Sequence, residues 1–141
     1  TIAILLVFTS SYNSYDVSVD INSFAPNFEI SKLGNHFKLS ETRGNYVIVN
    51  FWTSDDAEAR IRNIHYDRFF KSIGKNLSFI SVNFDDSDNM LSQFYEKDGM
   101  ESEVYKRYRL KSGMNSYLLD KDGKILAINP TQQQLTKYFC Q

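Results

Sequence analysis

The sequence predicts an α/β fold in which a central mixed β-sheet is flanked by helices, and three observations lead to it. Residues 46–52, YVIVNFW, are nearly continuous in apolar side chains, which suits a central strand covered on both faces. From Tyr46 onward the patterns follow the order strand, helix, strand, helix, strand, strand, helix. Asp122-Gly123 is a pair that tight hairpin turns favour. A right-handed β-α-β unit, a hairpin and a closing helix account for this order.

The composition indicates one globular domain with little net charge. A chain of 141 residues, 42% of them hydrophobic and 15% aromatic, is long enough for one core. The formal net charge of −1 gives no reason to expect a nucleic acid or an anionic membrane as partner. These features do not determine the oligomeric state.

The first eight residues, TIAILLVF, form an apolar run that is too short to span a bilayer. Two interpretations stay open: a buried strand, which we favour because Ile, Leu and Val dominate, and the apolar part of a secretory signal. We therefore divide the chain into two parts. Residues 1–24 are an N-terminal extension, either an added strand or hairpin or the remnant of a signal or preceding module, and residues 25–141 are the main domain.

The main domain is expected to open with a β-hairpin at Ala25-Pro26. Residues 27–31 and 36–39 predict its two strands, and Gly34-Asn35 predicts the turn between them. The central strand of residues 46–52 then follows.

A long helix is expected after the central strand. Ser54 or Asp55 is expected to cap it, with Asp56 and Glu58 in its electropositive first turn. Gly74 is expected to end it. The apolar row at roughly helical spacing is Ile61, Ile64, Phe69 and Ile73.

The remainder of the domain predicts three strands and three helical segments. The strands are expected over residues 77–84, 116–119 and 126–128, and the helical segments over residues 90–95, 102–110 and beyond Thr131. Residues 85–88 form a polar turn that suits the start of the first helical segment. Thr131 is expected to cap the last, which carries Leu135, Tyr138 and Phe139.

Four landmarks of the domain occur together. They are Ala25-Pro26-Asn27-Phe28, Leu39-Ser40, Val47 to Trp52, and the hairpin Tyr117-Leu118-Leu119-Asp120-Lys121-Asp122-Gly123-Lys124-Ile125. In this combination residues 25–139 resemble the thioredoxin-like proteins of the TlpA/ResA type, which are related to the AhpC/TSA peroxiredoxins. The resemblance implies a thioredoxin fold and a location in the periplasm or cell envelope of a Gram-negative bacterium.

The residues that carry the family's chemistry are replaced in this sequence. Where the family reads Phe-Trp-Ala-Ser-Trp-Cys-x-x-Cys-Arg, residues 51–60 read FWTSDDAEAR, so Asp56 and Ala59 stand in place of the two cysteines. Neither can supply the thiolate or the resolving thiol that disulfide exchange needs. Met114 stands where the family usually has a cis-proline. Because a cis bond before another residue costs about 3 kcal/mol, we expect a trans bond there.

The residues around this degenerate site are the candidate binding surface. They are Trp52, Asp55, Asp56, Ala59, Arg60 and Met114. Helix capping, which contributes about 1 kcal/mol, explains Asp55 or Asp56 better than an acidic site does. Trp52 is expected to pack beneath the loop rather than to form the floor of a ligand cleft.

No metal, cofactor or nucleic acid is predicted. Asp85, Asp86 and Asp88 lack the pattern of a twelve-residue calcium loop. A basic stretch, Lys106, Arg107, Arg109 and Lys111, is interleaved with Tyr105 and Tyr108, and it fits a solvated helix face better than a nucleic-acid site. The single cysteine, Cys140, cannot form an internal disulfide.

Three functions agree with these observations. The leading hypothesis is a redox-inactive thioredoxin-like domain that binds a protein or peptide along the altered active-site edge. The second is a thiol–disulfide oxidoreductase or antioxidant that acts through non-standard residues such as Cys140. The third is a structural domain of a larger envelope protein.

Overall fold

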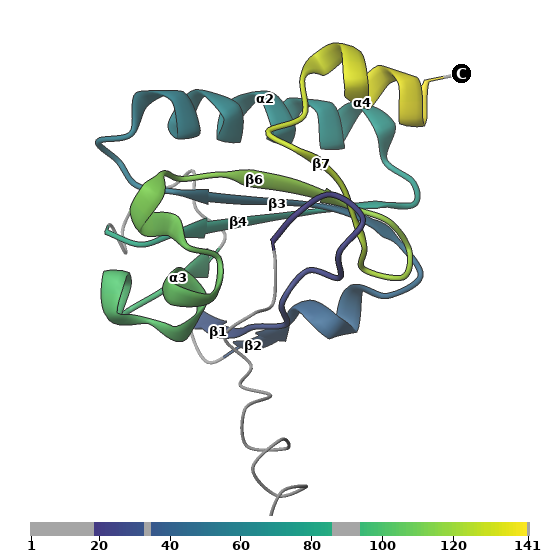
Figure 1. Ribbon diagram of the computed structural model, residues 1–141. Coiled ribbons are helices and arrows are strands. Elements are labelled where there is room, and N and C mark those ends of the chain that lie inside the picture. Colours follow the sequence, from purple (N-terminus) through teal and green to yellow (C-terminus); the bar gives the residue numbers. More distant parts are fainter. Residues whose placement is uncertain (1–18, 33–34, 86–93, 141) are drawn as a thin grey trace, which may run out of the picture.

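A computed structural model describes residues 19–32, 35–85 and 94–140, and its centre is a five-stranded mixed sheet (Figure 1). The strand order is β5-β4-β3-β6-β7. The strands are β3 (Tyr46–Trp52), β4 (Leu77–Asn83), β5 (Phe94–Tyr95), β6 (Ser116–Leu119) and β7 (Ile125–Ile128). β3, β4 and β5 are parallel, whereas β6 is antiparallel to both β3 and β7. The predicted α/β fold with a mixed sheet is confirmed.

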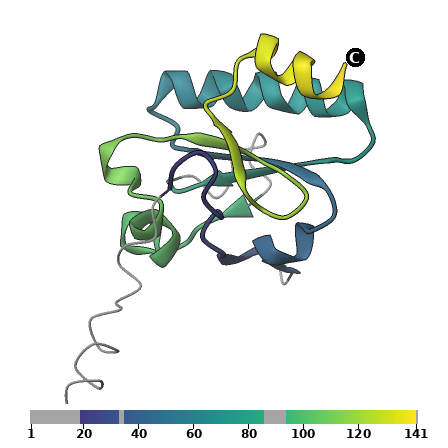
Figure 2. The ribbon, with the colours of Figure 1, turned by 45° about the vertical axis from the view of Figure 1, so that its right-hand side comes forward.

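Helices cover both faces of the sheet. α2 (Ala57–Ile73) and α4 (Gln132–Phe139) lie over one face, and α3 (Glu103–Arg107) lies on the other (Figures 1 and 2). A separate antiparallel hairpin of β1 (Glu29–Lys32) and β2 (Asn35–Lys38) lies on the side of α3. Among the described residues, three short 3-10 helices complete the fold, at Leu39–Thr42, Gly99–Glu101 and Leu110–Ser112.

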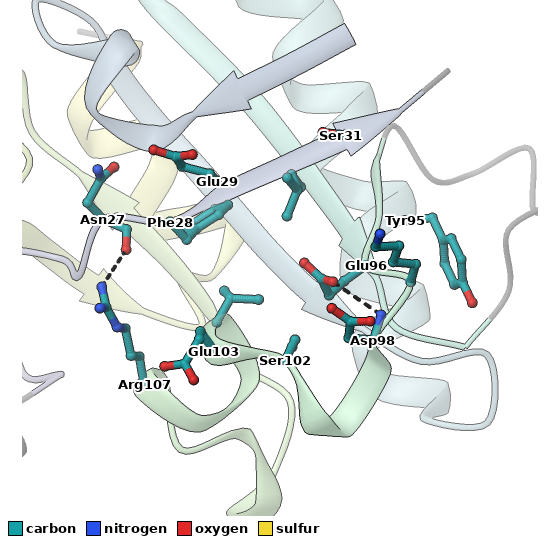
Figure 3. Close-up of a pocket in the computed structure, with 13 residues that line it drawn as sticks. Asn27, Phe28, Glu29, Ser31, Tyr95, Glu96, Asp98, Ser102, Glu103 and Arg107 are labelled. Carbon is teal, nitrogen blue, oxygen red and sulfur yellow. Dashed lines mark hydrogen bonds between the residues drawn. The ribbon is translucent and has the colours of Figure 1, made fainter. Parts of the chain in front are cut away.

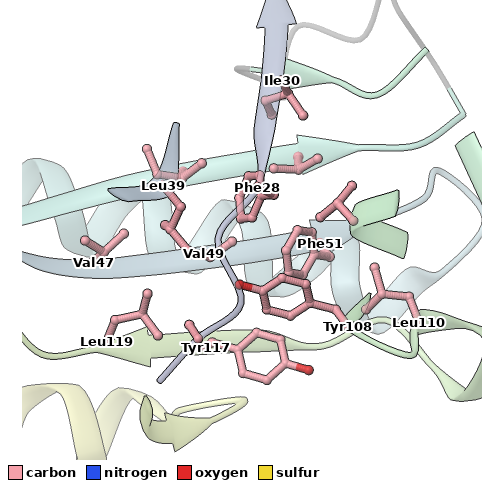
Figure 4. Packing of buried hydrophobic residues seen from close by; sticks show 14 of the residues in the cluster. Phe28, Ile30, Leu39, Val47, Val49, Phe51, Tyr108, Leu110, Tyr117 and Leu119 are labelled. Atoms are coloured by element: carbon pink, nitrogen blue, oxygen red, sulfur yellow. The ribbon is translucent and has the colours of Figure 1, made fainter. Parts of the chain in front are cut away.

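The alternation of side chains along β3 divides the core into two clusters. Val47, Val49 and Phe51 point toward the hairpin and α3, where aromatic rings pack closely (Figure 4). The ring centroids of Phe51 and Tyr108 are 4.7 Å apart. On the other face, Ile48 belongs to a second cluster under α2 and α4, with Tyr66, Phe69, Leu77, Phe79, Leu118, Ala127 and Leu135.

Several local predictions are confirmed. The strands β3 and β6 have the predicted bounds, and β4 and β7 differ from prediction by one residue. Gly74 ends α2 in the left-handed conformation, with φ of 70°. Thr131 caps α4 in a capping box with Gln134.

The predicted cap of α2 and part of its predicted buried face are wrong. Its N-cap is Asp56, rather than Ser54 or Asp55. The predicted apolar row is also displaced, because Ile61 is 48% exposed. Phe69 of the predicted row is buried as expected, whereas the other buried side chains are Ala59, Asn63 and Tyr66. The physical reason is a polar contact with the sheet, in which Asn63 meets the buried Asn50 of β3.

Two other helical predictions need correction. Of the segment predicted over residues 90–95, residues 90–93 lie outside the described residues, and Phe94–Tyr95 form β5 instead. The helix predicted over residues 102–110 ends early, because Arg109 adopts a left-handed φ of 54° that breaks α3 from the next 3-10 helix. The proposed strand or signal over residues 1–8, and Gly34 of the predicted turn, also lie outside the described residues.

None of the helices in the described ranges combines the length and apolar character that a membrane crossing requires. The basic side chains Lys106, Arg107, Arg109 and Lys111 are exposed. Tyr108, which lies between them in sequence, is buried against Phe51 and Phe28. Its ring is therefore part of the core and is not available to stack on a base.

Candidate functional site

The candidate site begins where β3 passes into α2. Trp52 is the last residue of β3 and is fully buried. The chain then turns, and the Asp56 carboxylate accepts a hydrogen bond from the Ala59 backbone N–H at 3.1 Å. This contact satisfies one of the open N–H groups at the start of α2. Asp55 is exposed, whereas Ala59 is fully buried.

The turn between β3 and α2 is held by the adjacent end of β4. The Ser54 backbone N–H donates to both carboxylate oxygens of Asp85, each at 3.0 Å, and the Ser54 hydroxyl donates to the same group at 3.2 Å. β3 and β4 are parallel, so both end at this edge of the sheet. Asp85 therefore acts here as an anchor. Asp86 and Asp88, which the sequence placed beside it, lie outside the described residues.

A buried polar network lies beneath the first turns of α2. Trp52 donates from its indole N–H to the Ser81 hydroxyl at 2.9 Å, and Ser81 donates to Asn63 Oδ1 at 2.6 Å. Asn50 donates from Nδ2 both to Asn63 Oδ1, at 3.1 Å, and to the Ala59 carbonyl, at 3.2 Å. Trp52 is thus a core residue, in agreement with the expectation that it packs beneath the loop.

The loop before β6 lies against the same part of α2. Arg62 donates from Nη2 to the Met114 carbonyl at 2.9 Å. The Asn115 carbonyl accepts from the Phe51 backbone N–H at 3.2 Å, which joins the loop to β3. The described peptide bonds, including those of Met114, are trans. Within the described residues, the Gly113 carbonyl accepts no hydrogen bond. The backbone N–H groups of Met114 and Asn115 donate none there either.

Tyr66 adds a second link between α2 and β6. Its hydroxyl lies 2.9 Å from the Ser116 hydroxyl and donates to the Pro130 carbonyl at 3.0 Å. Burial raises the pKa of Tyr66, and the Ser116 hydrogen bond and the Arg62 charge oppose this shift. Tyr66 therefore stays neutral at physiological pH, where it fixes the spacing between the helix and the sheet.

The structure brings together most, but not all, of the predicted site residues. Asp56 and Ala59 are joined by a hydrogen bond at the start of α2. Arg62 of the same helix brings in Met114, because it donates to the Met114 carbonyl. The Arg60 side chain is exposed and makes no hydrogen bond or ion pair within the described ranges, and only its backbone N–H bonds the Asp56 carbonyl, at 3.0 Å.

The cysteine lies at the opposite end of α2. Cys140 is exposed at the C-terminal cap of α4. Its neighbour Phe139 packs on Phe69 and on Tyr46, with centroid distances of 5.9 and 5.3 Å. Phe69 lies in the last turns of α2, a helix of 17 residues and so about 25 Å long. Asp56 and Cys140 are therefore separated by roughly the length of that helix.

Sequence reasoning underrated the residues that shape the site. Neither Arg62 nor Asn63 is among the candidate site residues that the sequence analysis names. A signal for the network was present in Asn50, a polar residue within an otherwise apolar strand, because a buried amide needs hydrogen-bonding partners. In the described part of the chain, no group of three or more His, Cys, Asp and Glu side chains is arranged to hold a metal ion.

The sequence of this chain is similar to sequences of known proteins. The sequence profile of the AhpC/TSA family matches residues 21–128. The chain is 26% identical to the thiol-disulfide oxidoreductase ResA of Bacillus cereus, over 91% of this chain and 82% of that protein.

Solved structures of similar fold include two that are more than 25% identical to this chain. A thioredoxin-like protein from Parabacteroides distasonis superposes with a TM-score of 0.72 at 28% identity, covering 86% of this chain and 96% of that one. A thiol-disulfide oxidoreductase from Bacteroides fragilis superposes with a TM-score of 0.67 at 26% identity, covering 82% and 96%. The profile match over most of the chain and the shared fold show that this chain belongs to the AhpC/TSA family and has a thioredoxin-like structure.

Proposed function

We propose that this chain is a redox-inactive member of its family that binds a protein or peptide in the bacterial cell envelope. The observation that carries the proposal is the pair Asp56 and Ala59 at the start of α2, where the family that the sequence resembles has two cysteines. Disulfide exchange needs a thiolate nucleophile and a second thiol to resolve the mixed disulfide. An aspartate and an alanine supply neither.

The remaining cysteine does not replace them. Cys140 is at the far end of α2 from Asp56, separated from it by about 25 Å of helix. Ala59 is fully buried and its carbonyl accepts a hydrogen bond from Asn50, so its position is filled by core packing. The scaffold has been retained, and the chemistry has been replaced by a capped helix start.

The proposed binding surface consists of Asp55, Asp56 and the loop of residues 113–115. The loop offers an acceptor at the Gly113 carbonyl and donors at the N–H groups of Met114 and Asn115, which suits a segment in extended conformation. The two carboxylates favour a partner with positive charge beside that segment. Replacement of the two cysteines by Asp56 and Ala59 therefore leaves a surface on which an extended chain can lie.

A reductase assay tests the redox part of the proposal. Insulin disulfide reduction with dithiothreitol is measured for the natural chain, for Cys140→Ser and for the double variant Asp56→Cys, Ala59→Cys. We expect the natural chain and Cys140→Ser to match the blank, and the double variant to accelerate the reaction. Turnover by the natural chain that disappears in Cys140→Ser would overturn the proposal and place the site at the C-terminus.

A capture assay tests the binding part. The natural chain and the double variant Asp55→Lys, Asp56→Asn are immobilised and exposed to an envelope extract. Asparagine keeps the helix cap, so the variant changes charge while α2 keeps its N-cap. We expect a partner that the natural chain retains and the variant loses, while the control Glu41→Lys retains it. Equal capture by all three chains would exclude this surface.

The location in the envelope rests on the family resemblance. It predicts that the protein expressed in its own cells is recovered with the periplasmic or envelope fraction. Recovery with the cytoplasmic fraction would contradict that part of the proposal. A longer gene product containing this domain would favour the structural role in a larger envelope protein.

A further inference from the structure

A cavity of about 850 Å³ lies on the face of the molecule opposite α2, between β1, the segment after β5, and α3 (Figure 3). Its volume is within the range of ligand and peptide pockets. The buried side chains of Phe28, Ile30 and Val104 contribute an apolar lining. The cavity has no lining residue in common with the surface of Asp55, Asp56 and residues 113–115.

One wall of this cavity is the outer edge of β1. The Phe28 carbonyl accepts from the Leu39 N–H, so the backbone groups of Phe28 point toward β2. Along an antiparallel strand this direction alternates, and the backbone groups of Asn27, Glu29 and Ser31 therefore point away from β2. Arg107 of α3 confirms the direction, because it donates to the Asn27 carbonyl at 3.2 Å (Figure 3).

The next two outward positions have no such partner. Within the described residues, the backbone N–H and C=O groups of Glu29 and Ser31 on this edge make no hydrogen bond. An unpaired strand edge beside a cavity is a template on which a second extended chain can pair. Hydrogen bonds of this kind come from the backbone, and the neighbouring pocket selects the side chains.

The charge of the lining indicates which side chains are selected. The lining carries four carboxylates and two basic side chains, namely Glu29, Glu96, Asp98, Glu103, Lys97 and Arg107. Glu29 is paired with His36 and Lys38, at 3.1 and 3.5 Å. In the described part of the chain, the other three carboxylates have no ion pair. A partner with lysine or arginine complements them.

We propose that this cavity binds an extended segment of a partner protein, which pairs as an additional strand with the outer edge of β1. The segment carries an apolar side chain that contacts Phe28, Ile30 and Val104, and lysine or arginine beside it that meets the acidic rim. This inference does not depend on the function proposed for the start of α2, because the two surfaces are formed by different residues.

The experiment uses a defined probe, the blocked peptide Lys-Val-Lys-Val-Lys, titrated into the isotope-labelled chain and followed by the amide NMR signals. We expect the signals of Glu29, Ser31 and residues 95–98 to shift, and those of residues 113–115 to stay in place. The peptide Glu-Val-Glu-Val-Glu is the charge control and is expected to shift none of them. Binding should weaken as salt is added, because the rim charges are exposed.

Two changes test the backbone pairing. The same peptide with both valines N-methylated keeps its side chains but loses donors, and the variant Ser31→Pro removes an outward N–H of β1 while the bonds to β2 stay. We expect about a tenfold loss of affinity or more for the N-methylated peptide, which loses two donors, and a smaller loss for Ser31→Pro, which loses one. Ser31→Ala is the matched control and should bind like the natural chain.

The rim charges are tested with Asp98→Lys, Glu103→Lys, against the exposed control Glu41→Lys outside the cavity. We expect about a tenfold weaker binding for the double variant and no change for the control. Absence of binding by the natural chain, equal binding of the N-methylated peptide, or shifts confined to residues 113–115 would each overturn the inference. Because the N-methylated peptide tests the pairing on the natural chain, the result does not depend on the folding of any variant.

Discussion

Arg62 and Met114 are 52 residues apart in sequence, yet Arg62 donates from Nη2 to the Met114 carbonyl at 2.9 Å. This bond joins α2 to the loop before β6, the two parts of the proposed binding surface. The Arg62 Nε atom is buried and has no hydrogen-bond partner within the described residues, so this guanidinium is held in the structure mainly through Nη2.

We expect Arg62→Met to lower the free energy of unfolding by about 1–2 kcal/mol, because a charged donor to a partly buried carbonyl is lost. Amide hydrogen exchange over residues 113–116 should become faster at the same time. Urea unfolding and exchange measured by mass spectrometry check both effects. Arg60→Met, two residues earlier and exposed, is the control and should change stability by less than about 0.5 kcal/mol.

The two aspartates before α2 should differ in their contribution to stability. Asp56 is the N-cap and accepts from the Ala59 N–H, so Asp56→Ala should cost about 1 kcal/mol. Asp55→Ala should cost less than about 0.5 kcal/mol, because Asp55 is exposed and is not the cap. Asp56→Asn should retain most of the stability. Thermal unfolding of the three variants measures these differences, and equal losses at both positions would contradict the capping assignment.

The buried network around Asn63 predicts a larger effect. Asn63→Ala removes the Oδ1 atom that accepts hydrogen bonds from both Asn50 and Ser81. The buried donor groups of Asn50 and Ser81 then lose this acceptor. We expect a loss of about 3 kcal/mol in the free energy of unfolding, measured in urea. Asn45→Ala, an exposed asparagine at the turn before β3, should be nearly neutral. A loss below about 1 kcal/mol for Asn63→Ala would mean that the site is wet rather than packed.

The buried tyrosines predict a loss of stability at alkaline pH. Burial raises the pKa of Tyr108 far above 10, its usual value, and the neighbouring Tyr117 raises it further. Burial raises the pKa of Tyr66 and Tyr117 in the same direction. A raised folded-state pKa means that stability is complete below pH 10 and declines above it, because only the unfolded chain then releases the proton.

Tyr108→Phe tests this prediction. The Tyr108 hydroxyl donates to the Pro26 carbonyl, so the variant should be about 1 kcal/mol less stable at pH 7. Above pH 10 the free energy of unfolding of the variant should fall less steeply than that of the natural chain. The difference in slope should reach up to about 1.4 kcal/mol per pH unit. Urea unfolding at a series of pH values measures both effects. Tyr138→Phe, at a tyrosine that is 47% exposed, should show the pH dependence of the natural chain.

Most strands of the sheet and the start of α4 could be predicted because their signals are local. The apolar run of β3, the Asp122-Gly123 turn and Thr131 each specify their conformation through nearest neighbours in the chain. The buried face of α2 could not be predicted in the same way, because Ile61 and Asn63 fit a helix equally well. Only packing on the sheet decides that Asn63 is buried and Ile61 is exposed. β5 was missed since two residues carry no periodicity, and their pairing with β4 is a tertiary contact.

The sequence by itself determined the class of fold, the family resemblance and the replacement of the two cysteines by Asp56 and Ala59, since these depend on residue type and order alone. Only the tertiary structure decided that Arg62 holds the Met114 carbonyl, that Asp85 anchors Ser54, and that the outer edge of β1 faces an acidic cavity. Each of these contacts joins segments far apart in the chain. Their partners are selected by the packing of sheet and helices, which no local pattern of residues contains.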